Sequence, residues 1–417
     1  MIETEAKVKR YERYKESGVE WLGEIPEHWK IERGKWLFIK NERPTRKDDE
    51  IVTCFRDGEV TLRSNRKKSG FTVALKEHGY QGIRKGDLVI HAMDAFAGAI
   101  GVSDSDGKST PVYSACTERF PGTINQYYYS YFLRSLALNG IILALAKGIR
   151  ERSTDFRFSD FGELLLSFPP LKEQTAIAQF LHDKTTKIDE AIAIKQQQIS
   201  LLKERKQILI HKAVTQGLNP NVKLKDSGVE WIGEIPEHWE VKRFKFLCHI
   251  TTGSKNTQDK VENGLYPFYV RSQTPEKINT YTFDGEAILT AGDGAGVGKV
   301  FHYLNEKFDF HQRVYKFSDF KNLEGKLLFY FLRSSFHNVA LNGEAKSTVD
   351  SLRLPLIQNF MVTIPSRKEQ IEIIERIETA SHKIETAISL KKQEIAKLKE
   401  YKSSLINSVV TGKVKVV

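Results

Sequence analysis

One polar segment with a regular apolar seam constrains the fold of this chain more than any other feature. Between Lys172 and Thr215 no proline or glycine occurs, and apolar residues recur in alternating steps of four and three. This heptad spacing predicts a long helix that buries one seam against another helix. Gly217 and Pro220 then end the pattern. The seam comprises Ile188, Ile192, Lys195, Ile199, Leu202, Lys206, Leu209 and Ala213.

The same seam occurs a second time, 196 residues further along the chain. Seven of its eight positions carry the identical residue, and Lys172-Glu173-Gln174 returns as Lys368-Glu369-Gln370. Two such helices in one chain are expected to pack on each other, because the tether raises their effective concentration. The second seam comprises Ile384, Ile388, Lys391, Ile395, Leu398, Lys402, Leu405 and Val409.

A second duplicated segment, which we call the cap, lies well before each helix. Residues 17–29 read Ser-Gly-Val-Glu-Trp-Leu-Gly-Glu-Ile-Pro-Glu-His-Trp, and residues 227–239 differ from them only at Leu22, which becomes Ile232. Its glycines, proline and tryptophans predict an ordered loop pinned by aromatic burial. His28 and His238 are expected to be structural, because neither has a second metal ligand at a suitable spacing.

Between each cap and its helix lies a block whose sequence differs between the two copies. Tyr-Phe-Leu-Arg-Ser occurs at 131–135 and at 330–334, which predicts a shared helix, while Leu88–His91 and Ala287–Thr290 predict strands. Asp94 and Gly98 can be aligned with Asp293 and Gly296 if one residue of slip is allowed. We therefore expect one α+β fold used twice with different surfaces, in the order 1–169 domain, 170–217 helix, 218–365 domain and 366–417 helix.

The short connection after the first helix bears on how the helices pair. Residues 217–225 reach about 30 Å when fully extended, whereas the clean heptads extend over roughly 39 Å. The linker cannot return along the helix, which favours an antiparallel pair over a parallel one, with the domains related by an approximate two-fold axis. In a centred register Lys195 would face Lys402 and Lys206 would face Lys391. We expect these lysines to reach outwards, or to meet carboxylates of a partner protein.

Composition and motif content narrow the possible functions. Lysine and arginine number 64 against 53 acidic residues, a formal net charge of +11 that points to an acidic partner such as nucleic acid. The three cysteines form no CxxC pair, and no apolar run resembles a signal peptide or membrane span, so a cytoplasmic location is expected. The run Gly292–Lys299 lacks the Ser or Thr that a phosphate-binding loop needs after its lysine. A glycine-rich turn between strands is the favoured interpretation, and no catalytic or metal-binding constellation is predicted.

Basic loops with polar hydrogen-bonding residues are the candidates for DNA contact. Arginine and lysine suit guanine edges and phosphates, and asparagine and glutamine suit adenine edges. The candidates are Arg63, Asn65, Arg66, Lys67, Lys68, Lys147, Arg150 and Arg152 in the first block, and Lys255, Asn256, Arg271, Gln273, Lys299 and Lys346 in the second.

The duplicated caps, the Lys-Glu-Gln helix starts and the two variable blocks together resemble the DNA-specificity subunit of type I restriction-modification systems. The resemblance covers nearly the whole chain. It implies a non-catalytic subunit in which each variable domain, a target-recognition domain, reads half of a split, asymmetric site in double-stranded DNA. It also implies that the paired helices set the spacing and dock two adenine methyltransferase subunits, and that a restriction and translocase subunit completes the complex.

The resemblance further implies that S-adenosylmethionine, ATP and Mg²⁺ belong to the partner subunits and that this chain binds no cofactor. The sequence itself is compatible with domains about 39 Å apart, or roughly 11 base pairs and close to one turn of the duplex. A coiled-coil adaptor without DNA readout remains the alternative, favoured by the helices but not by the basic variable blocks.

Overall fold

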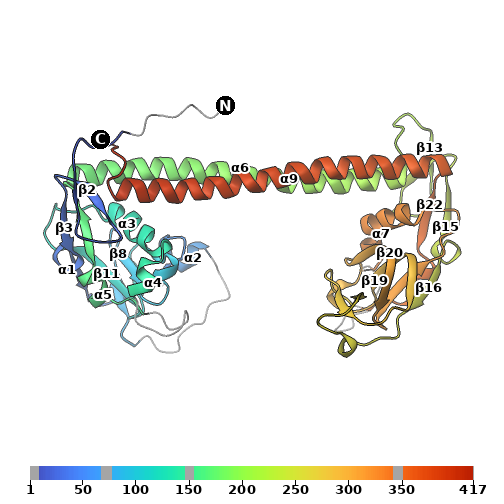
Figure 1. The fold of residues 1–417 in the computed structure, drawn as a ribbon, viewed down its shortest axis with the longest axis horizontal. Coiled ribbons are helices and arrows are strands. Elements are labelled where there is room, and N and C mark those ends of the chain that lie inside the picture. Colours follow the sequence, from blue (N-terminus) through green and yellow to red (C-terminus); the bar gives the residue numbers. More distant parts are fainter. Residues whose placement is uncertain (1–8, 67–77, 146–154, 341–350, 417) are drawn as a thin grey trace. The chain divides into compact units, whose positions relative to one another are not determined.

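The computed structural model describes residues 9–66, 78–145, 155–340 and 351–416, which form two compact units. Unit 1 consists of Met1–Ile194 with Gln393–Val417, and unit 2 consists of Lys195–Lys392. Each unit therefore combines one cap and one variable block with half of each long helix (Figure 1). The division cuts both helices in the middle instead of separating helices from domains.

Unit 1 is built on an antiparallel sheet with strand order β4-β11-β8-β9. The predicted strand Leu88–His91 is β8, and the predicted shared helix lies within α3. Alternate residues of the sheet enter two different cores, because successive side chains of a strand point to opposite faces. Leu88 and Ile90 pack with α3, whereas Val89 belongs to a second core on the other face, with Val52 and Val60 of the short strands β5 and β6. The elements are β1 (Tyr14–Glu16), β2 (Glu24–Pro26), β3 (Lys30–Arg33), α1 (Gly34–Leu37), β4 (Phe38–Asn41), β5 (Val52–Cys54), β6 (Val60–Leu62), α2 (Arg63–Arg66), β7 (Gln81–Ile83), β8 (Leu88–His91), η1 (Ala95–Ala97), β9 (Ile100–Val102), β10 (Gly107–Ser109), β11 (Tyr113–Glu118), α3 (Gln126–Leu138), α4 (Ile141–Leu145), α5 (Phe158–Glu163) and β12 (Leu165–Phe168).

Unit 2 repeats this framework and extends it. Its sheet has the order β16-β21-β19-β20-β17-β18, and the first four strands correspond in order to those of unit 1. The predicted strand Ala287–Thr290 lies inside β19, and the second copy of the shared helix lies inside α7. The elements are β13 (Leu224–Asp226), β14 (Glu234–Pro236), β15 (Glu240–Arg243), η3 (Phe244–Phe246), β16 (His249–Thr252), η4 (Thr257–Asp259), β17 (Tyr266–Tyr269), β18 (Glu276–Ile278), β19 (Phe283–Ala291), η5 (Gly294–Gly296), β20 (Phe301–Phe310), β21 (Val314–Ser318), α7 (Gly325–Ala340), α8 (Leu354–Gln358) and β22 (Met361–Ile364).

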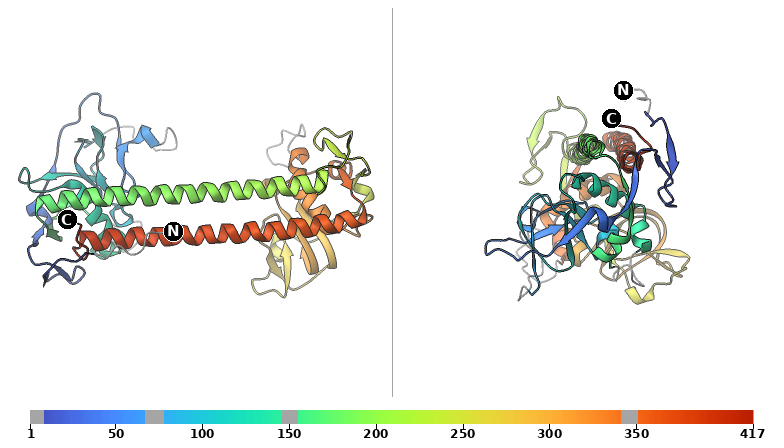
Figure 2. Two further views of the ribbon diagram at one scale, coloured as in Figure 1. Left: turned by 90° about the horizontal axis from the view of Figure 1, so that it is seen from above. Right: turned by 90° about the vertical axis from the view of Figure 1, so that its left-hand side faces the viewer.

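The two heptad segments are the long helices α6 (Leu171–Gln216) and α9 (Arg367–Val410). Within each unit, the half-helices lie side by side (Figure 2). In unit 1 Trp29 lies against both Glu173 at the start of α6 and Gly412 just after α9, and Asp189 binds Lys402 further along. In unit 2 the end of α6 and the start of α9 meet at Trp239 in the same way. The helices therefore run antiparallel, which confirms the favoured arrangement and excludes the parallel one.

The seam positions of both helices are the less exposed ones, whereas the residues between them are mostly exposed. Two of the four seam lysines meet carboxylates, as one of the two expectations had it, but these carboxylates belong to this chain and not to a partner protein. Lys206 Nζ lies 2.5 Å from Glu385 Oε1, and Lys402 Nζ lies 2.6 Å from Asp189 Oδ2. These are one ion pair occurring twice, because each residue of the first pair has its repeat equivalent in the second. The partner of each lysine is a carboxylate of the other helix of the same chain.

The cap anchors the helix ends, which explains why its sequence is duplicated. Trp29 is fully buried, and its Nε1 donates to Glu173 Oε2 at 3.0 Å. His28 Nε2 lies 2.6 Å from the other oxygen of Glu173, so this histidine is part of the helix anchor. Gly412, just after α9, has φ +75°, and a Cβ there would lie 3.0 Å from Trp29 Cζ3.

The glutamine of the Lys-Glu-Gln motif links each helix to its variable block. Gln174 is completely buried; its Oε1 accepts from Asn125 N at 2.8 Å, and its Nε2 donates to Pro169 O at 2.8 Å. Gln370 makes the equivalent bonds with Glu324 N and Pro365 O, at 2.8 and 2.9 Å.

Among the helices of the described ranges, none combines the length and apolar character that crossing a membrane requires.

Candidate nucleic-acid interface

The turn that joins β19 to β20 carries an aspartate that binds two arginines. Arg271 donates from Nη1 to Asp293 Oδ1 at 2.8 Å, and Arg313 donates from Nη1 to Oδ2 at 2.5 Å. The Asp293 side chain is only 9% exposed, whereas those of Arg271 and Arg313 are 46% and 61% exposed. One shielded carboxylate therefore orients two guanidinium groups that remain open to solvent.

The electrostatics of this cluster leave it positive. Burial alone would raise the pKa of Asp293, but the hydrogen bonds from Arg271 and Arg313 outweigh it and hold that pKa below its ordinary value. Asp293 is therefore ionised at neutral pH, and the three groups together carry one net positive charge. Burial, and then the charge of Arg271, lower the pKa of the neighbouring His311. This histidine is therefore neutral at pH 7.

Two further loops meet at the same place. The turn between β20 and β21 carries His311, Gln312 and Arg313. Gln312 donates through its backbone N–H to Lys255 O at 2.8 Å and through Nε2 to Asn256 Oδ1 at 2.5 Å. Amide side chains that suit adenine edges thus adjoin the arginines.

The glycines of the 292–298 run allow these loops to approach. A Cβ at Gly292 would lie 2.9 Å from Arg313 O, and one at Gly296 would lie 2.6 Å from Arg271 O. Both contacts are too close for any other residue without a backbone shift. This run connects β19 to β20, so the predicted glycine-rich turn between strands is confirmed.

Unit 1 contains the same arrangement in a reduced form. Arg56 Nη2 lies 2.8 Å from Asp94 Oδ1, and a Cβ at Gly98 would lie 2.9 Å from Arg56 O. Asp94 and Gly98 thus relate to Arg56 as Asp293 and Gly296 relate to Arg271. The alignment that was made from sequence with one residue of slip therefore marks an aspartate–arginine pair common to both domains.

The other candidates of the first block gather on the neighbouring turn. The short helix α2 packs on the turn between β5 and β6, which also carries Arg56. Arg66 Nη1 lies 2.8 Å from Asp57 Oδ2, and its guanidinium stacks 4.2 Å from the centre of the Phe55 ring. Arg63 donates to Thr53 Oγ1 at 3.3 Å, and Asn65 donates to Thr61 Oγ1 at 2.9 Å.

In the second block, Arg271 binds Asp293, and Lys255 and Asn256 contact Gln312, the neighbour of Arg313. Lys299 is exposed in the β19–β20 turn, and Gln273 is exposed two residues after Arg271. Six sequence candidates lie outside the described residues, namely Lys67, Lys68, Lys147, Arg150, Arg152 and Lys346.

Arg56, Gln312 and Arg313 were not among the sequence candidates, and the two aspartates were aligned without being assigned a role in binding. Arg313 stands in no basic run, and its partner Asp293 lies 20 residues away along the chain. The only sequence signal was the Asp–Gly match between the blocks, which points to the aspartates but not to the arginines they hold.

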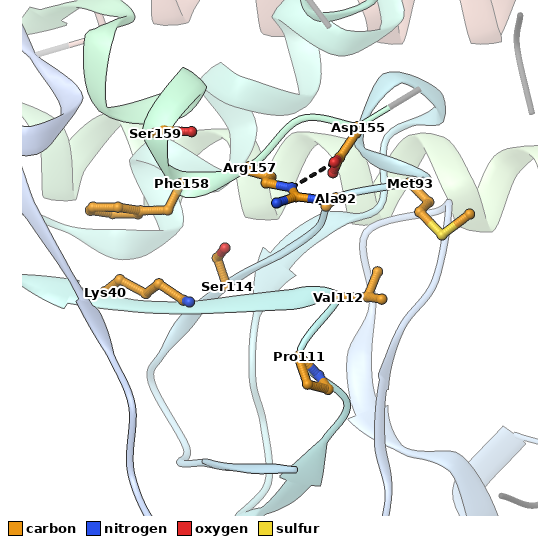
Figure 3. A pocket seen from close by; sticks show the side chains of 10 residues that line it. All are labelled: Lys40, Ala92, Met93, Pro111, Val112, Ser114, Asp155, Arg157, Phe158 and Ser159. Carbon is orange, nitrogen blue, oxygen red and sulfur yellow. Dashed lines mark hydrogen bonds and ion pairs between the residues drawn. The ribbon is translucent and has the colours of Figure 1, made fainter. Parts of the chain in front are cut away.

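Beside the aspartate–arginine pair of unit 1 lies a cavity of about 650 Å³ (Figure 3). Pro111, Val112 and Met93 form its apolar side, while Lys40 and Arg157 line it with positive charge. Arg157 Nε donates to Asp155 Oδ2 at 2.6 Å, which partly neutralises this wall. In the described ranges, no group of three or more potential metal ligands occurs.

The chain is thus a duplicated protein with two unlike α+β domains on a shared framework, and in each domain an aspartate holds at least one exposed arginine. Comparison with known proteins makes this description more specific. Residues 236–400 match the family model described as type I restriction modification DNA specificity domain. Over this segment the chain is therefore similar to type I restriction-modification specificity subunits.

Similar proteins agree with this assignment. The MjaVIII specificity subunit of Methanocaldococcus jannaschii is 27% identical over 61% of this chain and 63% of its own length, so the match spans less than two thirds of that relative. The putative MjaX specificity subunit of the same organism is 25% identical over 95% of this chain and 96% of its own length. A solved structure on complex assembly and conformational transition of the type I R-M system contains a chain with the same fold. It is 15% identical, covers 93% of this chain and 98% of its own, and has a TM-score of 0.70.

Proposed function

We propose that this chain is the DNA-reading subunit of a type I restriction-modification complex. Each variable domain reads one half of a bipartite, asymmetric site, and the chain itself makes and breaks no bonds. The helix pair docks two adenine methyltransferase subunits, and the restriction and translocase subunits join that assembly. S-adenosylmethionine, ATP and Mg²⁺ are bound by these partner subunits and not by this chain.

One observation carries the proposal. The two domains share strand order, cap and aspartate–arginine pair, yet the residues around that pair differ. A common framework with unlike surface residues is what recognition of two different half-sites requires, since phosphate contacts position a protein and base contacts specify the sequence. The formal net charge of +11 supports binding to DNA.

The test is to map methylated adenines in DNA from cells that express this chain with its partner modification subunits. A single asymmetric motif split by an unread spacer is expected, and it should vanish when this chain is omitted. Binding of the purified complex should weaken steeply as salt rises. An undivided motif, or methylation that persists without this chain, would contradict the proposal. Stable assembly with the partners but no sequence-selective methylation would favour the adaptor alternative.

A further inference from the structure

Two residues occupy the same place in the two domains although their chemistry differs. In unit 2, Gly292 N donates to Arg313 O at 2.8 Å, and Leu352 N donates to Gly292 O at 2.8 Å. In unit 1, Ala92 N donates to Val112 O at 3.0 Å, and Phe156 N donates to Ala92 O at 3.0 Å. These matching backbone bonds identify Val112 as the counterpart of Arg313.

Arg313 is held in a way that suits base recognition. Its bond to Asp293 engages Nη1, and a guanidinium carries five N–H donors in a rigid fork. The carboxylate limits the rotamers of the arginine before any ligand binds, so less conformational freedom is lost on binding. Since its side chain is 61% exposed, the rest of the fork is open to a ligand.

The shared arginines and the differing position have separate roles. Arg271 and Arg56 occur in both domains with the same aspartate and glycine partners, as expected of a framework contact. Position 313 differs between the domains, because the arginine of unit 2 is replaced by Val112 in unit 1. Valine lies with Pro111 against the cavity of unit 1 (Figure 3) and offers only apolar contact, for which the methyl group of thymine is the available partner in the major groove.

We propose that Arg313 reads a guanine in the half-site of the second domain, with Asp293 as its positioning residue, and that Val112 fills the equivalent place where the first domain reads no guanine. The proposal rests on the proposed function. Guanine is the base that fits, because its N7 and O6 accept two parallel bonds from one guanidinium. The amides of Gln312 and Asn256 lie beside this fork and extend the polar surface.

The experiment uses the full complex with its modification subunits and maps methylated adenines for the wild type, Arg313→Val, Arg313→Lys and Asp293→Asn. For Arg313→Val we expect one guanine of one half-site to become degenerate, with a roughly tenfold to hundredfold loss of discrimination, while the other half-site is unchanged. Arg313→Lys keeps the charge but loses the two-pronged fork, so it should relax the same position. Asp293→Asn should relax it as well, because the arginine is no longer held by a charge.

Lys307→Val is the matched control, because Lys307 is a half-exposed cation at the opposite end of the β19–β20 hairpin. It should leave the motif intact. A uniform fall in methylation with an unchanged motif in the Arg313 variants would show a phosphate contact and overturn the proposal. If Arg313→Val fails to assemble, Arg313→Lys decides alone. If the wild-type complex shows no split motif, the proposed function fails first, and the two failures are thereby distinguished.

Discussion

Glu369 joins the second cap to the start of α9 through hydrogen bonds to both. Its Oε1 receives Trp239 Nε1 at 3.2 Å and lies 2.9 Å from His238 Nε2, while Oε2 receives Ser366 Oγ at 2.7 Å. Ser366 and Glu369 form a reciprocal capping box at the start of α9. In unit 1 a proline replaces this serine, and Tyr11 Oη donates to Glu173 instead, at 3.0 Å.

Removing this carboxylate should destabilise unit 2. Glu369→Ala leaves the buried indole N–H of Trp239 and the end of α9 without their acceptor, so we expect a loss of about 1–3 kcal/mol. Urea unfolding followed by tryptophan fluorescence measures this free energy. The matched control is Glu372→Ala, one turn along α9, whose carboxylate only approaches Lys368 at 3.8 Å. Equal effects of the two substitutions would refute the anchoring role.

The same residue gives the stability a defined pH dependence. Burial alone would raise the pKa of Glu369, but hydrogen bonds from Ser366, His238 and Trp239 hold that pKa below the ordinary 4.5. A carboxyl group whose folded pKa is depressed stabilises the fold above its unfolded pKa and loses this effect as pH falls through the folded value. The difference between wild type and Glu369→Ala should therefore be full above about pH 4.5 and shrink below it.

Among elements, the helix pair was the easiest to predict and its register the hardest. Heptad spacing defines a seam but is unchanged when one helix slides by seven residues, so several registers satisfy the apolar pattern. The centred register that places lysine opposite lysine is one of them. In the structure Lys206 and Lys402 meet Glu385 and Asp189. Those carboxylates lie outside the seam, where a one-dimensional pattern assigns no partners.

The ion pair between Lys206 and Glu385 should contribute a small coupling energy. The Lys206 side chain is 20% exposed but that of Glu385 is 63% exposed, so solvent screens the pair. A double-mutant cycle of Lys206→Ala and Glu385→Ala should give a coupling of about 0.2–1 kcal/mol. This coupling should fall as ionic strength rises. A coupling of zero at low salt would mean that the pair takes no part in selecting the register.

The variable blocks show a second limit of sequence reasoning. The strands Leu88–His91 and Ala287–Thr290 and the helix at 131–135 were predictable, since periodicity and repetition mark them locally. The cluster around Asp293 was not, because Arg271 and Arg313 come from loops on either side of it in sequence. A run of basic residues can be recognised in a sequence, whereas a single arginine that is oriented by a carboxylate far away in the chain cannot.

At the scale of the whole molecule, the chain uses one framework twice and varies what it presents. Each variable block begins and ends on one two-stranded ladder, β3 with β12 in unit 1 and β15 with β22 in unit 2. Lys30 pairs with Phe168 in the first of these ladders. The two ends of a block therefore lie together at its junction with the cap and helices.

Because both ends of a variable block lie in one two-stranded ladder, we predict that a block can be exchanged as a unit. Replacing residues 30–167 with the corresponding block of another family member should change one half-site of the methylated motif and spare the other. The expectation follows because both cut points fall in a paired ladder, and the cap, Gln174 and the helices stay in place. Motif mapping of the chimera with its partner subunits is the measurement. A change in both half-sites would show that the domains do not read independently.

Unit 1 is formed by two chain segments that are far apart in sequence, and this affects the order in which the two units fold during synthesis. Its core includes Val409 and Val410, which close over Tyr128, whose hydroxyl donates to Val410 O at 3.0 Å. Unit 2 is one continuous stretch of the nascent polypeptide, and Ala213 and Val214 fill the equivalent core positions early in its synthesis. The domain translated first is therefore the one completed last, and its hydrophobic interior stays open until the residues that close it have followed all of unit 2 through the exit tunnel.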